Sequence, residues 1–388
     1  MKETAIYIHI PFCDHKCIYC DFYSIVSYEN VSSYLIALKK EIDFFAGKYS
    51  VDRKIISLFF GGGTPSFMEP EYIAEIIQHL KKNFNFVDDA EITLETNPGT
   101  VSKEKLRKFR EIGINRISIG IQSFDEDELK FLTRIHDSKT AIRTVKDASD
   151  SGFDNISIDL IFNLPKQTKE IWRSNLEQAI RLPIKHISTY SLILEHGTIL
   201  NKMVLDGKVK MQSTEGREDY DADLYQFTID FLTQHGFNQY EVSNFSRDGK
   251  ECVHNNAYWR YKDYLSFGTS AHSFVNLTTG KEGGKRWWNY SALNLYNNAI
   301  EKNGQAVIGE ELLTQNEMLE EYVMLALRSK GLDLIELKNL FGGNWFEQNK
   351  NFLTQLRNEN FLTVKNDLLS FTPKGYAICD EILTRIKN

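Results

Sequence analysis

Three of the chain's five cysteines lie close together in the stretch FCDHKCIYCDFY. Cys13, Cys17 and Cys20 follow a C-x3-C-x2-C spacing, and their thiolates are soft ligands that suit iron–sulfur clusters and zinc. A structural zinc site takes four ligands, so three thiols leave one position open. Cys252 and Cys379 are distant in the sequence, so that either could supply a fourth ligand only through the fold. We favour a 4Fe–4S cluster held at three irons, whose fourth iron is open to a small molecule, over a zinc loop or incidental cysteines.

The composition excludes several classes of protein. The 388 residues are enough for one large domain and one or two small ones. The formal net charge of −7 and the lack of a long basic run argue against a primary nucleic-acid binder. No apolar run is long enough for a transmembrane segment, and the N-terminus MKETAIYIHIPFC lacks the layout of a signal peptide. We therefore expect a cytoplasmic protein, in which clustered cysteines bind metal or do redox chemistry rather than form disulfides.

Short β-rich runs alternate with amphipathic helical stretches over the first half of the chain. The predicted strands are 5–10, 55–60, 91–95, 116–120, 155–162 and 186–193, and the clearest predicted helices are 31–46, 102–112 and 168–181. This alternation is typical of parallel strands joined by crossover helices. It predicts an α/β fold, an open, partial TIM-like (β/α)6 barrel, with functional residues at the carboxyl ends of the strands.

The pattern changes twice, which predicts three regions. Residues 1–235 would form the partial barrel. Residues 236–305 are rich in aromatic residues, Asn and Gly, and we expect an irregular segment with short strands. Residues 306–388 show helices, a hairpin over 361–371 and a last helix over 374–386, which predict a small helical, winged-helix-like domain. Acidic residues outnumber basic ones there, which favours a packing or interaction role over DNA binding.

Glycine-rich and polar motifs follow the predicted strands in order. They contribute Gly62, Gly63 and Thr64 in GGGTPS, Glu95 in LETNPG, Gln122 in GIQSF, Arg134 in TRIH and Asp159 in SIDLIFNLPKQT. A glycine-rich turn is often only a turn, and each polar residue alone is as readily a hydrogen-bonded structural group. Their shared place at strand ends makes them a candidate ligand shell.

These motifs together resemble the radical S-adenosylmethionine superfamily. The resemblance implies that the methionyl amino and carboxylate groups of S-adenosylmethionine chelate the open iron, and that one electron from the cluster cleaves the sulfonium to give a 5′-deoxyadenosyl radical. It also implies that the GGGTPS segment receives the methionyl amino group. The order of the strand-end residues is similar to the coproporphyrinogen-oxidase-like branch, in which Tyr7 and Tyr19 also line the site.

Two groups of that branch compete, and three features separate them. The oxygen-independent coproporphyrinogen III dehydrogenases oxidatively decarboxylate two propionates, whereas the HemW-type haem chaperones bind and deliver haem. The dehydrogenases carry a further cysteine where this chain has Phe22, and an N-terminal extension where this chain begins twelve residues before Cys13. The sequence HNNAYW fits the H-N-x-x-Y-W signature that the HemW group links to haem binding. The resemblance therefore favours the HemW-type group.

The HNNAYW motif offers His254, Asn255, Tyr258 and Trp259 as haem-binding residues. A neutral imidazole is a standard axial ligand of haem iron, and aromatic rings can pack on a porphyrin face. The alternative is structural: His254 and Asn255 hydrogen-bond the backbone of an irregular segment, and Tyr258 and Trp259 are core residues. His272 in SAHSF is a second candidate ligand, with a buried, hydrogen-bonded histidine as its alternative.

The prediction that follows is a haem chaperone that carries a 4Fe–4S cluster and S-adenosylmethionine and transfers haem to acceptor proteins. Respiratory, membrane-associated proteins are the acceptors we expect, reached by peripheral docking at the membrane. The alternative is a radical enzyme that acts on a porphyrinogen. The sequence leaves open whether S-adenosylmethionine is cleaved, which residue is the axial ligand, and whether the chain forms a homodimer.

Overall fold

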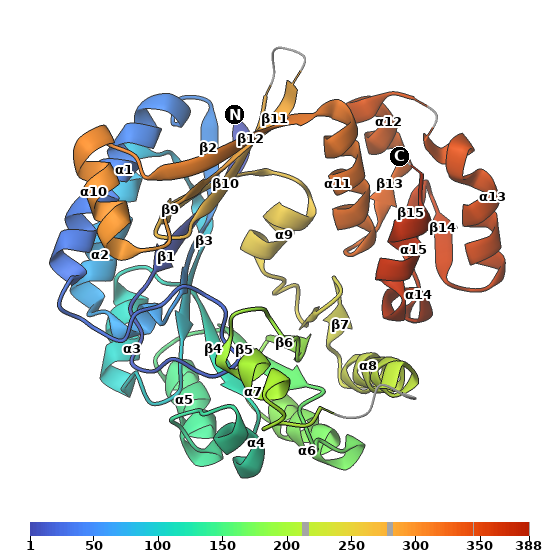
Figure 1. Ribbon diagram of the computed structural model, residues 1–388, viewed down its shortest axis with the longest axis horizontal. Coiled ribbons are helices and arrows are strands. Elements are labelled where there is room, and N and C mark those ends of the chain that lie inside the picture. Colours follow the sequence, from blue (N-terminus) through green and yellow to red (C-terminus); the bar gives the residue numbers. More distant parts are fainter. Residues whose placement is uncertain (212–216, 278–281, 344, 388) are drawn as a thin grey trace.

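The first half of the chain forms the parallel part of one large sheet. Figure 1 shows the computed structural model, which describes residues 1–211, 217–277, 282–343 and 345–387. The parallel strands are β1 (Lys2–Ile10), β2 (Arg53–Gly62), β3 (Phe86–Thr96), β4 (Arg116–Gln122), β5 (Asn155–Phe162) and β6 (His186–Ser191). Each pairs in parallel with the next. All six predicted strands are thus confirmed, and their carboxyl ends meet at one end of the sheet.

Helices connect these strands and cover the outer side of the sheet (Figure 1). They are α1 (Val31–Tyr49), α2 (Pro70–Asn83), α3 (Lys103–Glu111), α4 (Glu126–Phe131), α5 (Ser138–Asp150) and α6 (Lys169–Ile180), with a short 3-10 helix η1 (Pro65–Phe67). Side chains of Ser102, Asp137 and Thr168 accept hydrogen bonds from backbone N–H groups in the first turns of α3, α5 and α6. The three predicted helices are confirmed, with ends that differ by a few residues.

The sheet stays open, as the prediction of a partial barrel requires. Its order is β12-β11-β10-β9-β1-β2-β3-β4-β5-β6-β8-β7. Strand β9 continues the parallel register beside β1, so the chain returns to the first strand after completing the six units. Among the described helices, none is long and apolar enough to cross a membrane.

The described residues of 236–305 contain short strands, as predicted, and also two helices, so that this segment is more regular than the sequence indicated. After α7 (Ile199–Leu205) and α8 (Arg217–Gln234) come β7 (Asn238–Gln239), β8 (Asn244–Ser246), α9 (Val253–Trp259), β9 (Asp263–Gly268), β10 (His272–Asn276), β11 (Glu282–Asn289), α10 (Leu293–Asn303) and β12 (Val307–Thr314). Strands β9 to β12 widen the main sheet, and α9 lies on its inner side (Figure 1). The alternation typical of a strand was hidden in β11, because the two large residues Trp287 and Trp288 follow each other there. Trp287 stacks on α1, with its ring centroid 5.4 Å from that of Phe45 and 5.6 Å from that of Tyr49.

The C-terminal unit has its own hydrophobic core. It consists of α11 (Gln315–Leu327), β13 (Leu332–Asp333), α12 (Leu334–Phe341), α13 (Trp345–Asn358), β14 (Leu362–Lys365), β15 (Leu368–Phe371), α14 (Pro373–Ala377) and α15 (Cys379–Arg385). The predicted hairpin is confirmed as β14 and β15. The predicted last helix is two helices, because Ile378 adopts a non-helical φ of −124° and ψ of 27°.

Two buried or half-buried carboxylates join these parts of the molecule. Glu41 of α1 accepts hydrogen bonds from Tyr296 Oη (2.6 Å), Asn289 Nδ2 (2.6 Å) and the Gly268 backbone N–H (2.9 Å). Burial raises the pKa of Glu41 from 4.5 to about 7. Glu321 of α11 accepts two hydrogen bonds from Arg286 Nη2 of β11, at 2.6 and 2.7 Å, and so ties the C-terminal unit to the main sheet.

Candidate cofactor and ligand site

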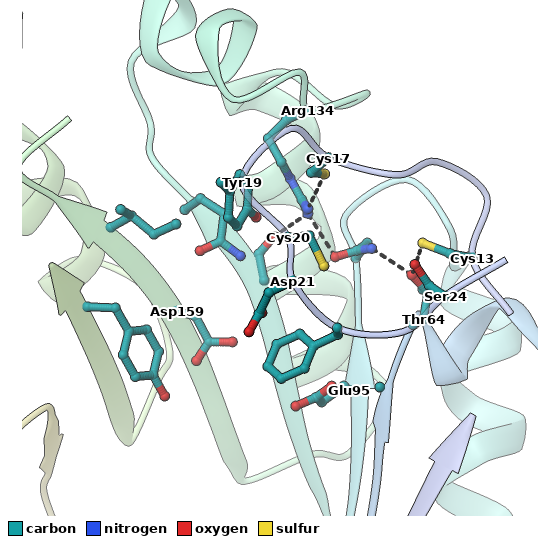
Figure 2. A pocket seen from close by; sticks show the side chains of 18 of the residues that line it. Cys13, Cys17, Tyr19, Cys20, Asp21, Ser24, Thr64, Glu95, Arg134 and Asp159 are labelled. Atoms are coloured by element: carbon teal, nitrogen blue, oxygen red, sulfur yellow. Dashed lines mark hydrogen bonds between the residues drawn. The ribbon is translucent and has the colours of Figure 1, made fainter. Parts of the chain in front are cut away.

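A cavity of about 340 Å³ lies at the carboxyl ends of the parallel strands (Figure 2). Its lining includes all three predicted cluster ligands and every predicted shell residue except Tyr7. These are Cys13, Cys17, Tyr19, Cys20, Gly62, Gly63, Thr64, Glu95, Gln122, Arg134 and Asp159. The fold therefore brings together residues that lie up to 146 positions apart because the parallel strands all end at this edge.

The cysteine loop leaves β1 and closes back on itself. The Cys13 N–H donates to Ile25 O (3.0 Å), and the Ile25 N–H donates to Pro11 O (2.8 Å). All three cysteines of the loop are free thiols, and burial raises the pKa of Cys13 and Cys20. The guanidinium of Arg134 donates to Cys17 Sγ at 3.4 Å.

The donor set fits a cluster with three ligated irons. The other two cysteines are elsewhere: Cys252 caps α9, with its Sγ 3.5 Å from Glu91 Oε1, and Cys379 is buried in the core of the C-terminal unit. Neither lines the cavity. Three soft thiols with no fourth cysteine beside them match a 4Fe–4S cluster with one open iron better than a closed zinc site.

The glycine-rich turn packs directly against this loop. The Gly63 N–H donates to Ile10 O and the Thr64 N–H to Phe12 O, both at 2.8 Å. A Cβ on Gly63 would lie 2.6 Å from Phe12 O, so only glycine fits without moving the loop. Thr64 Oγ1 also lies 3.0 Å from Cys13 Sγ. The turn thus sets the position of the cysteine loop.

Asp21, Glu95 and Asp159 bring three carboxyl groups to the cavity, and the last two have raised pKa values (Figure 2). Burial raises the pKa of Glu95 to about 8, and the nearby Asp159 carboxylate adds to the shift. Burial also raises the pKa of Asp159, against hydrogen bonds from Ser188 and Ser118 that favour its ionised form. Glu95 is therefore largely protonated near neutral pH and can donate a hydrogen bond to a ligand.

The sequence analysis missed Asn97, which lies between the cluster loop and the strand ends. Its Nδ2 donates to Thr64 Oγ1 (2.9 Å), and its Oδ1 accepts from Arg134 Nη2 (2.8 Å). Asn97 lines the cavity and holds Arg134 in place. The available signal was its position in the motif LETNPG, two residues after Glu95.

A second cavity of about 310 Å³ adjoins the first, between the parallel strands and helix α9. We call the space inside the curved sheet that holds both cavities the bore. Tyr7, His254, Asn255 and Tyr258 line it, and Tyr7 shares this cavity with the predicted shell residues Gly62, Glu95 and Asp159. Both cavities share the residues Phe22, Gly62, Glu95, Ser118, Asp159 and Tyr190. Trp259 ends helix α9 outside the described lining of either cavity.

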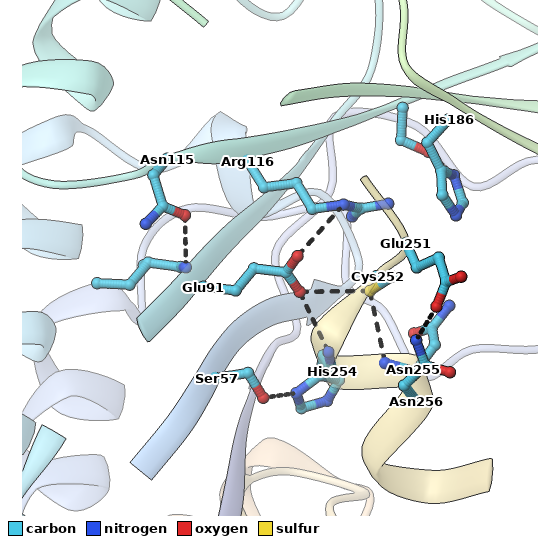
Figure 3. A network of polar contacts seen from close by, with 12 residues as sticks. Ser57, Glu91, Asn115, Arg116, His186, Glu251, Cys252, His254, Asn255 and Asn256 are labelled. Atoms are coloured by element: carbon cyan, nitrogen blue, oxygen red, sulfur yellow. Dashed lines mark hydrogen bonds and ion pairs between the residues drawn. The ribbon is translucent and has the colours of Figure 1, made fainter. Parts of the chain in front are cut away.

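Both ring nitrogens of His254 are already engaged, and Figure 3 shows the contact with Ser57. Nδ1 lies 3.0 Å from Ser57 Oγ, and Nε2 lies 2.9 Å from Tyr258 Oη. The ring stacks on Phe59 with centroids 4.9 Å apart, and burial lowers the pKa of His254 to about 3. His254 is thus a neutral imidazole that orients Tyr258 within the cavity wall.

His272, the second candidate, has a different environment. It is exposed at the start of β10 and stacks on Trp288, with ring centroids 6.0 Å apart. Burial of part of the ring, with a smaller contribution from Arg286, lowers the pKa of His272. The structural alternative to a ligand role for His272, a buried and hydrogen-bonded histidine, is wrong because the residue is exposed.

Comparisons with known proteins agree with this geometry. Residues 7–179 match the Radical SAM superfamily, and residues 313–378 match the HemN C-terminal domain. The protein named Heme chaperone HemW from Lactococcus lactis subsp. lactis is 31% identical over 99% of this chain and 97% of its own length. This chain belongs to the HemW family. The HemW of Bacillus subtilis is 35% identical, over 84% of this chain and 83% of its own.

The HemW family fold is shared with a solved structure of the related branch. Coproporphyrinogen III oxidase (HemN) from Escherichia coli, described as a radical SAM enzyme, superposes with a TM-score of 0.82 at 25% identity, over 99% of this chain and 89% of that one. The predicted fold class, a partial barrel of the radical SAM type with a small C-terminal domain, is confirmed. So is the predicted place of the chain in the HemW-type group.

Proposed function

We propose that this protein is a haem chaperone that holds a 4Fe–4S cluster and S-adenosylmethionine and transfers haem to acceptor proteins. The observation that carries the proposal is the convergence of three free thiols and the strand-end shell on one cavity, in a chain of the HemW family. The names of the relatives, Heme chaperone HemW, support haem as the cargo. The acceptors we propose are respiratory proteins, met in the cytoplasm or at the membrane surface.

In this proposal Cys13, Cys17 and Cys20 hold the cluster. When bound, the cluster and S-adenosylmethionine supply one-electron cleavage of the sulfonium. The remaining task of the chain is to bind and orient. Arg134 donates a hydrogen bond to Cys17 Sγ, and Asn97 fixes Arg134. Backbone groups of the glycine-rich turn and side chains of the shell would receive the amino acid and nucleoside parts of S-adenosylmethionine. The proposed binding residues are Tyr7, Tyr19, Gly62, Gly63, Thr64, Glu95, Gln122, Arg134 and Asp159.

The haem would lie beside this site, against helix α9. Asn255 and Tyr258 line the second cavity and offer an amide and a phenol to a ligand. His254 contributes by holding Tyr258, since its own ring nitrogens are both hydrogen-bonded. Trp259 would pack at the end of the helix. We thus propose a haem role for the HNNAYW motif in which His254 positions a neighbour rather than ligates iron.

An anaerobic haem titration of the cluster-reconstituted protein, followed by Soret absorbance, tests the proposal. We expect saturable one-to-one binding to the wild type. The His254→Ala variant should bind roughly twofold to tenfold more weakly, because Tyr258 loses the hydrogen bond that orients it. His235→Ala, which removes a histidine whose Nδ1 bonds Phe231 O on helix α8, is the matched control. Weak, non-saturable binding that is the same in all three proteins would overturn the proposal.

A second candidate is a radical enzyme that decarboxylates a porphyrinogen. The 0.82 TM-score against coproporphyrinogen III oxidase supports it. Phe22, where the dehydrogenases carry a further cysteine, lines both cavities and speaks against it. Incubation with coproporphyrinogen III under anaerobic, reducing conditions decides the matter, because formation of protoporphyrinogen IX would exclude a protein that is only a chaperone.

A further inference from the structure

A buried arginine lines the second cavity without a close partner. Arg116, at the start of β4, is 2% exposed. The nearest carboxylate oxygen, Glu91 Oε2, lies 3.9 Å from its Nε, and this Nε has no hydrogen-bond acceptor (Figure 3). In the part of the chain that the structure describes, the guanidinium makes no hydrogen bond. A buried guanidinium in this state is costly, so the site is built for a further acceptor.

Glu91 does not fill that role because other donors hold it. The His254 backbone N–H donates to Glu91 Oε1 at 3.1 Å, and the Cys252 thiol donates to the same oxygen at 3.5 Å. These bonds fix the carboxylate between β3 and the first turn of α9 (Figure 3). The donors of Arg116 that line the cavity therefore remain for a ligand.

The other cavity walls also favour an acceptor. Hydroxyl groups of Tyr7, Ser118, Ser188 and Tyr258 and the amide of Asn255 line the same space. Of the two other carboxyl groups in the lining, Glu95 is largely protonated near neutral pH, as its pKa of about 8 requires, and Asp159 is held by the two serines. Negative charge on a ligand is thus opposed mainly by Asp159 and attracted by Arg116.

The volume limits what can enter. About 310 Å³ is at the low end for a drug-sized ligand, so the cavity takes an arm of a larger molecule rather than the whole. Phe22 and Tyr190 lie where the two cavities meet and are 60% and 43% exposed. Their rings give a planar apolar macrocycle a surface at the mouth of the bore.

We propose that Arg116 is the subsite for a carboxylate arm of the tetrapyrrole, a propionate that enters the bore while the macrocycle rests against Phe22 and Tyr190. This inference rests on the proposed haem binding. It gives the HNNAYW segment a specific part: Asn255 and Tyr258 line the path of the arm, and His254 holds both Tyr258, through its ring, and Glu91, through its backbone. The geometry thus links the motif to the carboxylates of haem rather than to its iron.

The test compares haem with haem dimethyl ester, in which both propionates are esterified. Both compounds are titrated anaerobically into the cluster-reconstituted full chain, with and without S-adenosylmethionine. We expect the wild type to bind the diacid roughly tenfold to a hundredfold more tightly than the ester, as a charge-assisted hydrogen bond to a buried arginine provides. Arg116→Gln should bind the two compounds alike, and Arg116→Lys should restore part of the preference.

Arg53→Gln is the matched control. Arg53 is also a buried arginine, 8% exposed, but its Nη2 lies 2.5 Å from Asp263 Oδ2, and it does not line the cavity. This variant should keep the full preference for the diacid. A preference for the diacid that survives in Arg116→Gln would overturn the inference. A wild-type preference that disappears when S-adenosylmethionine is added would also overturn it, because Arg116 would then bind the methionyl carboxylate.

The wild type alone keeps the inference testable if Arg116→Gln fails to fold. Equal affinity of the wild type for haem and for its dimethyl ester overturns the carboxylate subsite but leaves haem binding intact. If neither compound binds the wild type, the proposed function itself fails, and the subsite fails with it.

Discussion

At the scale of single residues, position separates the candidate cluster ligands from the other cysteines. Cys13, Cys17 and Cys20 line the cavity at the strand ends, whereas Cys379 lies in an apolar core, where burial raises its pKa to about 11. The same residue type is therefore a candidate ligand in one place and a small apolar side chain in the other.

Replacing Cys17 with Ala should abolish the brown iron–sulfur chromophore, because two thiols cannot hold a cluster at three irons. Iron and sulfide content after anaerobic reconstitution measures this. Cys379→Ala is the control and should keep a full complement of both. A Cys17→Ala protein with as much iron and sulfide as the wild type would refute the assignment of the ligands.

Replacing Gly63 with Ala should weaken cluster binding without unfolding the chain. The new Cβ would meet Phe12 O at 2.6 Å and push the cysteine loop away from the turn. Circular dichroism should stay close to the wild type while the iron content falls by about half or more. Gly47→Ala is the control: a Cβ there meets nothing within 4 Å, and in helix α1 it should stabilise by roughly 0.5–1 kcal/mol. Full iron content in Gly63→Ala would show that the loop can move aside.

The sequence was informative where function follows from spacing and order. Cys13, Cys17 and Cys20 are local, and the strand-end residues follow from the topology, so their convergence could be predicted. Arg116 and the bonds of His254 could not, because they depend on which side chains meet across the bore from strands β2, β3 and β4 and helix α9. Such contacts between distant segments leave no periodic signal in one sequence.

At the scale of elements, the six βα units were predictable and the return to the sheet was not. Apolar runs alternate with amphipathic helices through these units, whereas α9 is capped by Cys252, which is not a usual capping residue, and contains two asparagines. Strand β9 was hidden as well, because residues of both of its faces are buried. Tertiary packing, rather than local propensity, determines both elements.

The Glu41 contact between α1, β9, β11 and α10 should make stability depend on pH. Its pKa of about 7 in the folded protein exceeds the 4.5 of the exposed group, so folding takes up a proton between these values. The stabilisation is complete below pH 4.5 and is lost as the pH rises through 7. From pH 5 to 8, the free energy of unfolding of the wild type should fall by about 2–3 kcal/mol relative to Glu41→Gln, which cannot titrate.

Urea denaturation of both proteins at pH 5, 6, 7 and 8 measures this difference. Glu95 and Glu241, whose pKa values are also raised, titrate equally in both proteins and cancel in the comparison. A constant difference across the four pH values would mean that Glu41 stays in one protonation state.

At the scale of the whole molecule, the C-terminal unit is joined to the main sheet by few polar contacts. The Nη2 of Arg286 donates to both carboxylate oxygens of Glu321, and Tyr261 Oη donates to the same carboxylate at 2.7 Å. Both charged side chains are about a quarter exposed, so solvent screens only part of the interaction. The pair is therefore a specific link between two separate cores.

Glu321→Gln should lower the stability of the attachment by roughly 1–2 kcal/mol, because it removes the charge from a hydrogen-bonded ion pair. Differential scanning calorimetry should show the C-terminal unit melting earlier, or the single transition splitting. In the control Glu347→Gln, the lost pair with Lys350 is exposed and lies within α13, so the change should stay within about 0.5 kcal/mol. Identical melting of the two variants would show that the Arg286–Glu321 pair does not help to hold the units together.

The walls common to the two cavities have a thermodynamic consequence. Phe22, Gly62, Glu95, Ser118, Asp159 and Tyr190 face both spaces, so a molecule in one space changes the side chains that a molecule in the other space meets. By linkage, the factor by which one occupant changes the affinity for the other equals the factor by which the other changes the affinity for the first. Under the proposed function, haem and S-adenosylmethionine would therefore be reciprocal effectors of each other, and loading in either order would lead to the same final free energy.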